Sequence, residues 1–275
     1  MTEIHYNLTN KQYHAKDGKL SSSGIKELLK SPMHFKNYIE NPTEPTTEMV
    51  RGTLVHALIL EPEKFENEFV VCDASIRRGK EYESALAQNQ NRTVVLAGEY
   101  EEACKIKDSF NLQLKENPQL KSLLEGTKEA SIYFTDKRTG IPCKIRPDNI
   151  TNIGHIVDLK TSYNASFDAF QKQVVDLGYY ISAAFYLRGI SHIRDIRGVS
   201  VPPMRFTLVV IETKAPYPVA IYTLSNKAIE IGNNMVNKAL DRYAEGVSTD
   251  IWEGYSKEPI EMELPNWALY KLNSK

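Results

Sequence analysis

Two acidic residues and a lysine stand close together in the middle of the sequence. Asp158 and Lys160 are separated by one residue in HIVDLKT (155–161), and Asp148 ends the preceding stretch IPCKIRPD (141–148). Successive side chains of a β-strand point to opposite faces, so Asp158 and Lys160 share one face. The short connection through 150–154 can fold Asp148 back towards Asp158. We therefore expect two carboxylates and one ammonium group to converge at the edge of a sheet.

This combination of groups is suited to metal-assisted chemistry on a phosphate. Two neighbouring carboxylates repel each other unless a cation lies between them, and hard oxygen ligands favour magnesium or manganese. The lysine could orient or deprotonate a metal-bound water, or stabilise charge that develops on a phosphate. The same D-x-K spacing also arises as a simple salt bridge on a solvated strand face. The spacing alone leaves both interpretations open.

The surrounding sequence predicts both helices and strands. Runs of alternating and β-branched residues, separated by the turn-like DKRTG and NITNIG, predict three sequential strands that form an antiparallel meander. Apolar residues at helical spacing predict helices elsewhere, with Ser31 and Pro32 as an N-cap and first-turn pair. The expected strands are 130–135, 141–148, 155–161, 204–213 and 218–225. The expected helices lie at 22–30, 32–41, 49–62, about 98–116, 164–190 and about 225–245, whereas 73–93 reads as an exposed polar segment.

Composition indicates a globular chain with one sizeable core. The 275 residues are 41% hydrophobic and 25% charged, and the net charge of −1 means that nucleic acid would have to bind to a local basic patch. The three cysteines form no CxxC pair, which argues against a disulfide framework or a zinc knuckle. No stretch approaches the length of a membrane span, and MTEIHYNLTN contains no signal-peptide core, so we expect a cytoplasmic protein.

We expect a single domain, residues 1–275. Its parts are N-terminal helices (1–70), a polar loop and helix (71–127), a catalytic sheet with helices (128–250) and a tail (251–275).

The order of these motifs resembles a known nuclease superfamily. An RPD strand end, nine intervening residues, DLK and then a helix is the arrangement of the PD-(D/E)XK nucleases. Residues 13–225 resemble, in order, the nuclease domain of RecE-type exonucleases (exodeoxyribonuclease VIII), within the RecB-like group. The resemblance implies an α/β (α+β) fold with a restriction-endonuclease-like core: a central mixed β-sheet flanked by helices, with a helical N-terminal region. The stretches that carry it are YHAKDGKLSSSGIKELLKSPMHF, GTLVHALILEPEKF, RRGKEY, TGIPCKIRPD, HIVDLKTSYNASFDAF and GYYISAAFYL.

The resemblance assigns roles to the residues of the strand motif. Asp148 and Asp158 match the two metal-binding acids, and the carbonyl of Leu159 is a further candidate ligand. Lys160 matches the catalytic lysine. The implied cofactor is Mg²⁺, with Mn²⁺ as the alternative.

Two more residues are assigned to the site with alternatives left open. His56 matches the helix histidine beside the metal in RecB-like nucleases, and it shares a helical stripe with Met49, Gly52 and Ile59, so we expect it to face inward. Its alternative is a histidine satisfied within the core. Glu129 opens the first strand of the meander, where such nucleases often carry an acid that reaches the metal. Its alternative is a surface glutamate.

One motif departs from the family pattern. RecB-like nucleases carry Q-x-x-x-Y on the helix after the D-x-K strand, and the corresponding positions here are Ser182 and Tyr186. The tyrosine is present and serine replaces the glutamine, which contacts the DNA backbone or supports the site in those enzymes. We assign both positions to DNA binding and expect strand binding to differ in detail.

DNA binding also requires basic residues near the site, because phosphate neutralisation supplies most of the affinity. Arg77, Arg78 and Lys80 form one basic cluster, and its alternative interpretation is a solvated loop without DNA contact. No base-reading motif is visible, which suits an enzyme that digests without regard to sequence. The basic candidates for DNA contact are Arg51, Arg77, Arg78, Lys80, Lys144 and Arg146.

The implied function is a metal-dependent exodeoxyribonuclease acting on the ends of double-stranded DNA. Enzymes of this type degrade one strand of a linear duplex from its 5′ end and leave a 3′ overhang for a single-strand-annealing recombinase. They form homo-oligomeric rings, so a tetramer in a phage or prophage setting is implied as well. The alternatives are a PD-(D/E)XK endonuclease, a single-strand nuclease, or a non-catalytic DNA-binding descendant.

Overall fold

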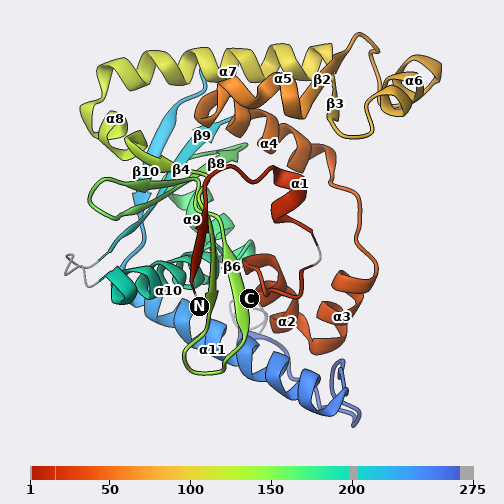
Figure 1. The fold of residues 1–275 in the computed structure, drawn as a ribbon, viewed down its shortest axis with the longest axis vertical. Helices are drawn as coiled ribbons and strands as arrows, with labels where there is room; N and C mark the ends of the chain where they lie inside the picture. Colours follow the sequence, from red (N-terminus) through yellow and green to blue (C-terminus); the bar gives the residue numbers. More distant parts are fainter. Residues whose placement is uncertain (1, 16, 198–203, 267–275) are drawn as a thin grey trace, which may run out of the picture.

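The computed structural model describes residues 2–15, 17–197 and 204–266 (Figure 1). Helices predominate at the start of the chain, and the strands of residues 126–162 follow one another in its middle. The strands are β1 Glu3–His5, β2 Phe69–Cys72, β3 Thr93–Leu96, β4 Gly126–Lys128, β5 Ser131–Thr135, β6 Pro142–Ile145, β7 Asn149–Thr151, β8 Ile156–Ser162, β9 Phe206–Glu212 and β10 Val219–Thr223. The helices are α1 Asn10–Tyr13, α2 Ser22–Lys30, α3 Pro32–Glu40, α4 Thr47–Leu60, η1 Pro62–Lys64, α5 Phe65–Glu68, α6 Lys80–Gln88, α7 Ala97–Glu116, α8 Pro118–Leu124, α9 Phe167–Asp176, α10 Tyr179–Arg197 and α11 Asn226–Thr249.

A five-stranded mixed sheet forms the centre of the molecule. Its strand order is β10-β9-β8-β7-β4, with β8 and β9 parallel and the other neighbours antiparallel. The helices α4 and α7 cover one face, and α10 and α11 cover the other (Figure 1). The predicted central mixed sheet flanked by helices is observed.

Alternation along β8 divides its side chains between two hydrophobic cores. A one-residue shift of register would move Val157 and Leu159 to the opposite face of the sheet, so the packing specifies the register.

 Val157 and Leu159 are 1% exposed and pack towards α4 and α7, whereas the fully buried Ile156 packs towards α10 and α11. Asp158 and Lys160 share the face of Ile156, as alternation predicts. The two polar side chains therefore point to the α10 side of a strand that is otherwise buried.

The predicted three-stranded meander is wrong in one of its two pairings. Within the described residues, β5 and β6 form a hairpin that belongs to a separate sheet of order β1-β5-β6, and β6 does not pair with β8. The short strand β7 pairs with β8 instead. The chain changes sheets between Arg146 and Asp148, where Pro147 lacks the N–H group that a continuing ladder would need. Asp148 consequently lies in the link between two sheets rather than at a strand end.

Most predicted helices are present, and one is divided. Ser31 caps α3 by accepting a hydrogen bond from the backbone N–H of His34 (3.2 Å), as its pairing with Pro32 predicts. The segment 164–190 contains two helices, because α9 ends and α10 begins on either side of Leu177 and Gly178. Gly178 has φ +62°, a left-handed conformation that ends a helix and that glycine adopts most readily.

The polar segment 73–93 contains more regular structure than we predicted. It includes α6, and the parallel strands β2 and β3 lie on either side of it in sequence. Tyr82 of α6 is buried in a small separate core with Cys72, Ala74 and Val94. Buried aromatic and aliphatic side chains thus anchor a stretch that its polar composition marked as a loop.

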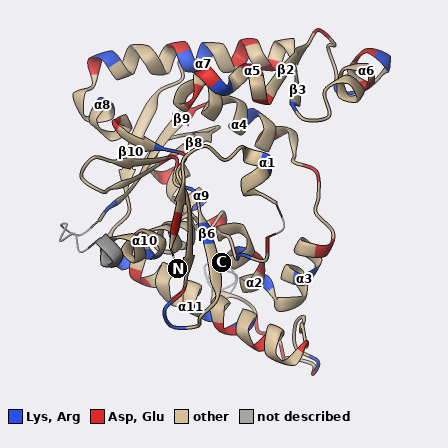
Figure 2. Ribbon diagram, viewed as in Figure 1, with Lys and Arg blue, Asp and Glu red and all other residues tan. Residues whose placement is uncertain are grey.

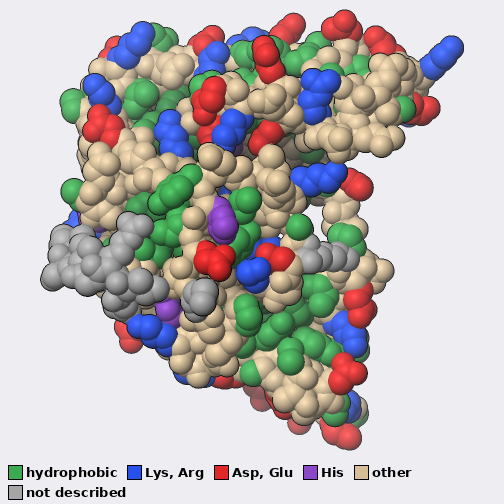
Figure 3. All heavy atoms as spheres, in the orientation of Figure 1, with side chains coloured by type: hydrophobic (Ala, Val, Ile, Leu, Met, Phe, Trp, Pro, Cys, Tyr) green, Lys and Arg blue, Asp and Glu red, His purple; other side chains and the backbone are tan. Residues whose placement is uncertain are grey.

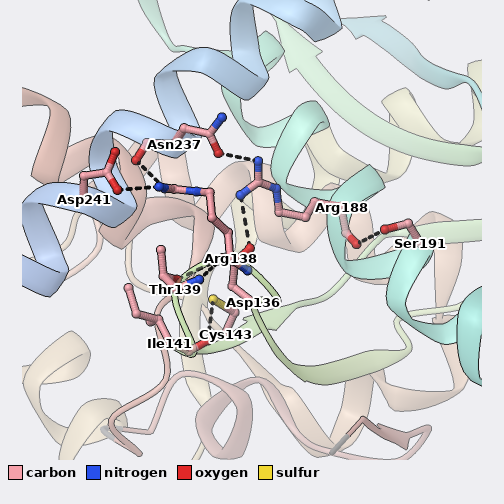
Figure 4. Close-up of polar contacts among 9 residues, drawn as sticks. All are labelled: Asp136, Arg138, Thr139, Ile141, Cys143, Arg188, Ser191, Asn237 and Asp241. Atoms are coloured by element: carbon pink, nitrogen blue, oxygen red, sulfur yellow. Dashed lines mark hydrogen bonds and ion pairs between the residues drawn. The ribbon is translucent and has the colours of Figure 1, made fainter.

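An ion-pair network holds the β5–β6 hairpin against α10 and α11 (Figure 4). Asp136, 3% exposed, accepts hydrogen bonds from the guanidinium of Arg188 (3.1 Å) and from the backbone and hydroxyl of Thr139 (3.0 and 2.9 Å). Arg138 pairs with Asp241 (2.6 Å). The network fixes the hairpin that leads into Asp148.

The C-terminal residues from 251 to 266 have little regular structure. Trp252 stacks on Phe35 with 5.8 Å between ring centroids, while Tyr255 is 77% exposed. Residues 267–275 of the predicted tail lie outside the described residues. No helix in the described ranges is long and apolar enough to cross a membrane.

Candidate active site

Asp148 is held at the centre of the candidate site by β8. Its Oδ2 accepts a hydrogen bond from the backbone N–H of Leu159 (2.6 Å). Leu159 lies two residues beyond Val157, where the pairing of β8 with β7 ends. The Nδ1 of His56 on α4 lies 3.5 Å from the same oxygen. The strand and the helix thus orient one carboxylate from two directions, and the predicted proximity of Asp148 to β8 is observed.

Glu129 reaches the same place from the link between β4 and β5. Its backbone has φ +48°, which is uncommon for a residue with a side chain, and its N–H donates to the carbonyl of Asp148 (3.2 Å). One ligand atom each from His56, Glu129 and Asp148 lies within 4.8 Å of the other two. One nitrogen and two carboxylate oxygens suit a divalent cation such as manganese or magnesium.

The pair Asp158 and Lys160 lies beside this triad. The Nζ of Lys160 forms an ion pair with Asp158 and donates to the carbonyl of Leu159 (3.2 Å). It also lies 5.4 Å from the ring centroid of Tyr179, in cation–π geometry. In this arrangement Lys160 neutralises Asp158. Metal ligation by Asp158 and by the Leu159 carbonyl stays a prediction.

The carboxyl groups of Asp148 and Glu129 are harder to ionise than ordinary carboxyl groups. Burial and the charge of Asp158 raise the pKa of Asp148, and burial and the charge of Asp148 raise the pKa of Glu129 to about 9. Burial disfavours the charged form of Lys160, but Asp158 and Asp148 outweigh it and raise the pKa of this lysine. A bound divalent cation would relieve the repulsion among the carboxylates, so the site fits a metal.

A cavity of about 270 Å³ opens beside the triad. Its walls include Tyr13 and His14 of the N-terminal segment, Gly52 of α4, Arg146 and Tyr186, together with all three triad residues. Figure 3 shows a histidine side chain at the centre of the viewed face with acidic and basic side chains near it. Burial raises the pKa of the Tyr186 hydroxyl well above its ordinary value, so this group is a neutral hydrogen-bond donor.

Lys144 has a different environment from the one we predicted. It is 5% exposed, and its Nζ donates to the carbonyls of Tyr13 (2.7 Å) and Ala15 (2.9 Å) and to Asp17 (2.9 Å). These three bonds use every N–H group of the ammonium. The expected phosphate contact is therefore replaced by an internal role, which is to hold the N-terminal segment.

Arg146 has a related role but lies at the cavity. Its guanidinium donates to Ser131 (2.8 Å) and to the carbonyl of Leu8 (3.1 Å), and it lies 4.2 Å from the ring centroid of Tyr13. Since Arg146 also lines the cavity, a DNA contact by this residue stays a prediction.

Of the remaining basic candidates, Arg51 lies on α4, Arg77 and Arg78 lie between β2 and α6, and Lys80 begins α6. Figure 2 shows the Lys and Arg residues of the described chain in blue. Arg77 forms two bonds to the carboxylate of Glu99 (3.1 and 2.6 Å) and one to Tyr82 (3.1 Å), so its charge is used inside the protein. A phosphate contact by Arg77 stays a prediction, and it would compete with the ion pair to Glu99. Arg51 also approaches Glu99 (3.4 Å) but is 58% exposed. Arg78 and Lys80 are exposed, and their contact with DNA stays a prediction.

The two positions of the helix motif lie on α10. Ser182 accepts a hydrogen bond from the hydroxyl of Ser22 on α2 (2.8 Å), and Tyr186 lines the cavity. Met49, expected on the inward stripe with His56, is 61% exposed, whereas Gly52 lies at the cavity. The inward stripe of α4 therefore lies closer to Gly52 and His56 than to Met49.

Several residues near the site were not identified from the sequence. Tyr13 and His14 line the cavity, and Lys26 lies near Lys160. Glu61 and Glu68 also line the cavity. Each of these residues reaches the site through tertiary contacts, and no spacing in the sequence connects it to the D-x-K motif.

Comparison with known families agrees with this geometry. Residues 21–261 match the family described as a PDDEXK-like domain of unknown function (DUF3799). Because the match spans most of the chain, the chain belongs to this family. The family and the site together place the protein in the PD-(D/E)XK nuclease superfamily and support a nuclease.

Two further proteins are similar to this chain. A crystal structure of a proposed exonuclease from Eubacterium rectale superposes with a TM-score of 0.60 at 15% identity, covering 96% of this chain and 98% of that one. At this identity the likeness shows the fold alone. Translation initiation factor IF-2 of Wolbachia sp. subsp. Brugia malayi (strain TRS) is 25% identical over 173 residues, which are 61% of this chain. The aligned part is 20% of that protein, so the chain spans about a fifth of its length.

Proposed function

We propose that this protein is a Mg²⁺-dependent exodeoxyribonuclease that degrades linear double-stranded DNA. The observation that carries the proposal is the convergence of His56, Glu129 and Asp148 beside the ion pair of Asp158 and Lys160. A divalent cation held by two carboxylates and an imidazole, next to a buried ammonium group, is equipped to hydrolyse a phosphodiester.

The residues of the site divide the work of this reaction. The cation would supply Lewis acidity at the phosphate and charge neutralisation for the leaving 3′-oxygen. Lys160, whose pKa is raised beside Asp158 and Asp148, carries a proton and stabilises negative charge that develops on the phosphate. Asp148 and Glu129 would hold the cation together with His56, and the hydroxyl of Tyr186 can donate to a substrate oxygen at the cavity.

The proposed direction of degradation and its proposed product are based on the resemblance to RecE-type enzymes. One strand is degraded 5′ to 3′, and the 3′ overhang is passed to a single-strand-annealing recombinase. The chain works as a homotetrameric ring around its substrate. Light scattering during size-exclusion chromatography would then give four times the 31.3 kDa chain mass, and a monomer peak at working concentration would remove the ring from the proposal.

Digestion of linear and circular DNA tests the activity. End-labelled linear duplex and a closed circular control are incubated with Mg²⁺ or with EDTA. The enzymes are the wild type, Lys160→Ala, and Lys172→Ala as a matched control at an exposed lysine of α9. We expect the wild type and Lys172→Ala to shorten only linear DNA from its 5′ ends. EDTA or Lys160→Ala should reduce the rate by about a thousandfold or more.

Each other result has a defined meaning. Cutting of the closed circle would identify an endonuclease on the same scaffold. Shortening from the 3′ ends would overturn the polarity and keep the nuclease. The absence of any cleavage by the wild type would leave a non-catalytic descendant of the family.

A further inference from the structure

A lysine of the N-terminal helix α2 lies beside the catalytic strand. The Nζ of Lys26 donates to the carbonyl of Leu177 (3.3 Å), the residue between α9 and α10. One turn earlier on α2, the hydroxyl of Ser22 bonds to Ser182 of α10 (2.8 Å). These contacts fix the face of α2 that carries Lys26 against the first turn of α10.

The aliphatic stem of Lys26 packs against Gly178. A Cβ atom added to Gly178 would lie 3.2 Å from Cδ and 3.8 Å from Cγ of Lys26, so the lysine stem passes over this residue in van der Waals contact. The next residue, Tyr179, places its ring 5.4 Å from the Nζ of Lys160. The ammonium groups of Lys26 and Lys160 therefore approach the same helix junction, one from α2 and the other from β8.

The charge of Lys26 is poorly compensated. Its bonded partner is a neutral carbonyl, and within the part of the chain that the structure describes no carboxylate lies within 4.0 Å of its Nζ. Burial and the nearby charge of Lys160 lower the pKa of Lys26, whereas the more weakly acting Asp158 raises it. A half-buried cation without a counter-ion is costly, and an anion bound between the two ammonium groups would remove the cost.

We propose that Lys26 binds a backbone phosphate of the DNA strand, next to the phosphate that reacts at Lys160. The ligand class is a phosphodiester, since Lys26 approaches the same helix junction as Lys160 and offers a compact charge on a flexible four-carbon stem. This inference rests on the proposed nuclease function. It adds a substrate contact from α2, outside the D-x-K strand and the helix motif.

DNA binding under non-cleaving conditions tests the inference. Anisotropy of a fluorescein-labelled duplex is measured with Ca²⁺ in place of Mg²⁺, over a series of KCl concentrations. The variants are Lys26→Met, which keeps the stem, and Lys26→Arg, which keeps the charge. The control is Lys30→Met, one turn further along α2, where the lysine is 56% exposed and pairs with Glu27 (2.7 Å).

We expect Lys26→Met to weaken binding about fivefold and to reduce the slope of log K against log salt concentration by about one. Lys26→Arg should restore both quantities, and Lys30→Met should leave both unchanged. The thermal midpoint of no variant should fall below that of the wild type, because a packing defect would lower the midpoint without changing the salt slope. An unchanged slope and affinity for Lys26→Met would overturn the inference.

The failure of the inference and the failure of the nuclease proposal can be told apart. If the wild type binds DNA but does not cut it with Mg²⁺, the hydrolytic function is wrong, and the salt slopes still decide the role of Lys26. If the wild type cuts DNA and Lys26→Met binds normally, only the Lys26 contact is wrong. If the wild type neither binds nor cuts, both are wrong.

Discussion

The position of Glu129 in the candidate site makes its carboxyl group harder to ionise. Its backbone is left-handed, and its side chain is brought against Asp148 in a half-buried position. Burial and the neighbouring carboxylate raise its pKa to about 9, so at neutral pH the metal-free protein holds this side chain protonated. A divalent cation must displace that proton to bind the carboxylate, so metal affinity should rise with pH.

The stability of the metal-free protein should report the same ionisation. Between about pH 4.5, where an unfolded glutamate titrates, and about pH 9, the folded state binds one more proton than the unfolded state. The wild type should therefore lose stability relative to Glu129→Gln as pH rises across this range, by at most about 1.4 kcal/mol per pH unit. The measurement is urea unfolding of both proteins in EDTA at pH 5, 7 and 9.

Glu125→Gln provides the control for that series, since Glu125 lies four residues earlier and is exposed. The difference in free energy of unfolding between Glu125→Gln and the wild type should not change with pH. A constant difference between Glu129→Gln and the wild type would show that Glu129 ionises normally in the folded protein.

At the scale of elements, the N-terminal segment forms a wall of the active-site cavity. Lys144 of β6 binds the carbonyls of Tyr13 and Ala15, and Arg146 binds that of Leu8. Two basic residues that the sequence offered as DNA contacts thereby connect this segment to the hairpin preceding Asp148. The position of α1 and the position of the metal ligands are coupled through one strand.

Removing the central contact of this segment should loosen it. Lys144→Met leaves two carbonyls and Asp17 without their buried partner, so we expect a loss of about 3 kcal/mol in the free energy of unfolding. Limited proteolysis should cut within residues 6–20 faster than in the wild type. The salt slope of DNA binding should not change, because Lys144 has no donor free for phosphate.

Lys172→Met, at an exposed lysine, should change none of these three quantities. A reduced salt slope for Lys144→Met with normal stability would instead restore this residue to the DNA-binding surface.

At the scale of the whole molecule, the candidate metal site joins parts that belong to different cores. His56 comes from α4, which packs in the core on one face of the central sheet, whereas β5 and β6, which flank Glu129 and Asp148 in sequence, pack in the core on the other face. A cation at the triad would therefore connect the two halves of the fold. Binding to the native state alone stabilises the whole protein by mass action.

We expect divalent cations to raise the thermal midpoint of the wild type. At a free metal concentration one hundred times the dissociation constant, the gain is about 2.7 kcal/mol, or roughly 5–10 °C for a chain of this size. Asp148→Asn keeps an oxygen that can accept from Leu159 but removes the charge, so its midpoint should be insensitive to Mg²⁺ and Mn²⁺. Differential scanning fluorimetry with and without each metal gives the comparison.

Asp168→Asn, at an exposed residue of α9, is the matched control and should retain the full metal shift. An undiminished shift in Asp148→Asn would mean that the metal binds elsewhere.

Much of the fold could be predicted because its signals are local. The caps and periodicity of α2, α3 and α7 and the alternation of β8 all depend on residues close in sequence. The failures were non-local. The pairing partner of β6 depends on which sheet accepts it after Pro147, and α6 is anchored by Tyr82 in a core assembled from distant residues. Localisation and the recombinase partner stay predictions.

The sequence by itself determined the chemical identity of the site. Asp148, Asp158 and Lys160 could be named as candidates from residue type and strand alternation, which are local properties of the chain. Their roles, and His56 as a further candidate, came from the resemblance to the PD-(D/E)XK nucleases. Only the tertiary structure decided how their neighbours act. Lys144 binds a carbonyl 131 residues away in the sequence, and this contact buries its ammonium group inside the protein. Lys26 binds a carbonyl 151 residues away, and this contact brings its ammonium group towards the candidate site.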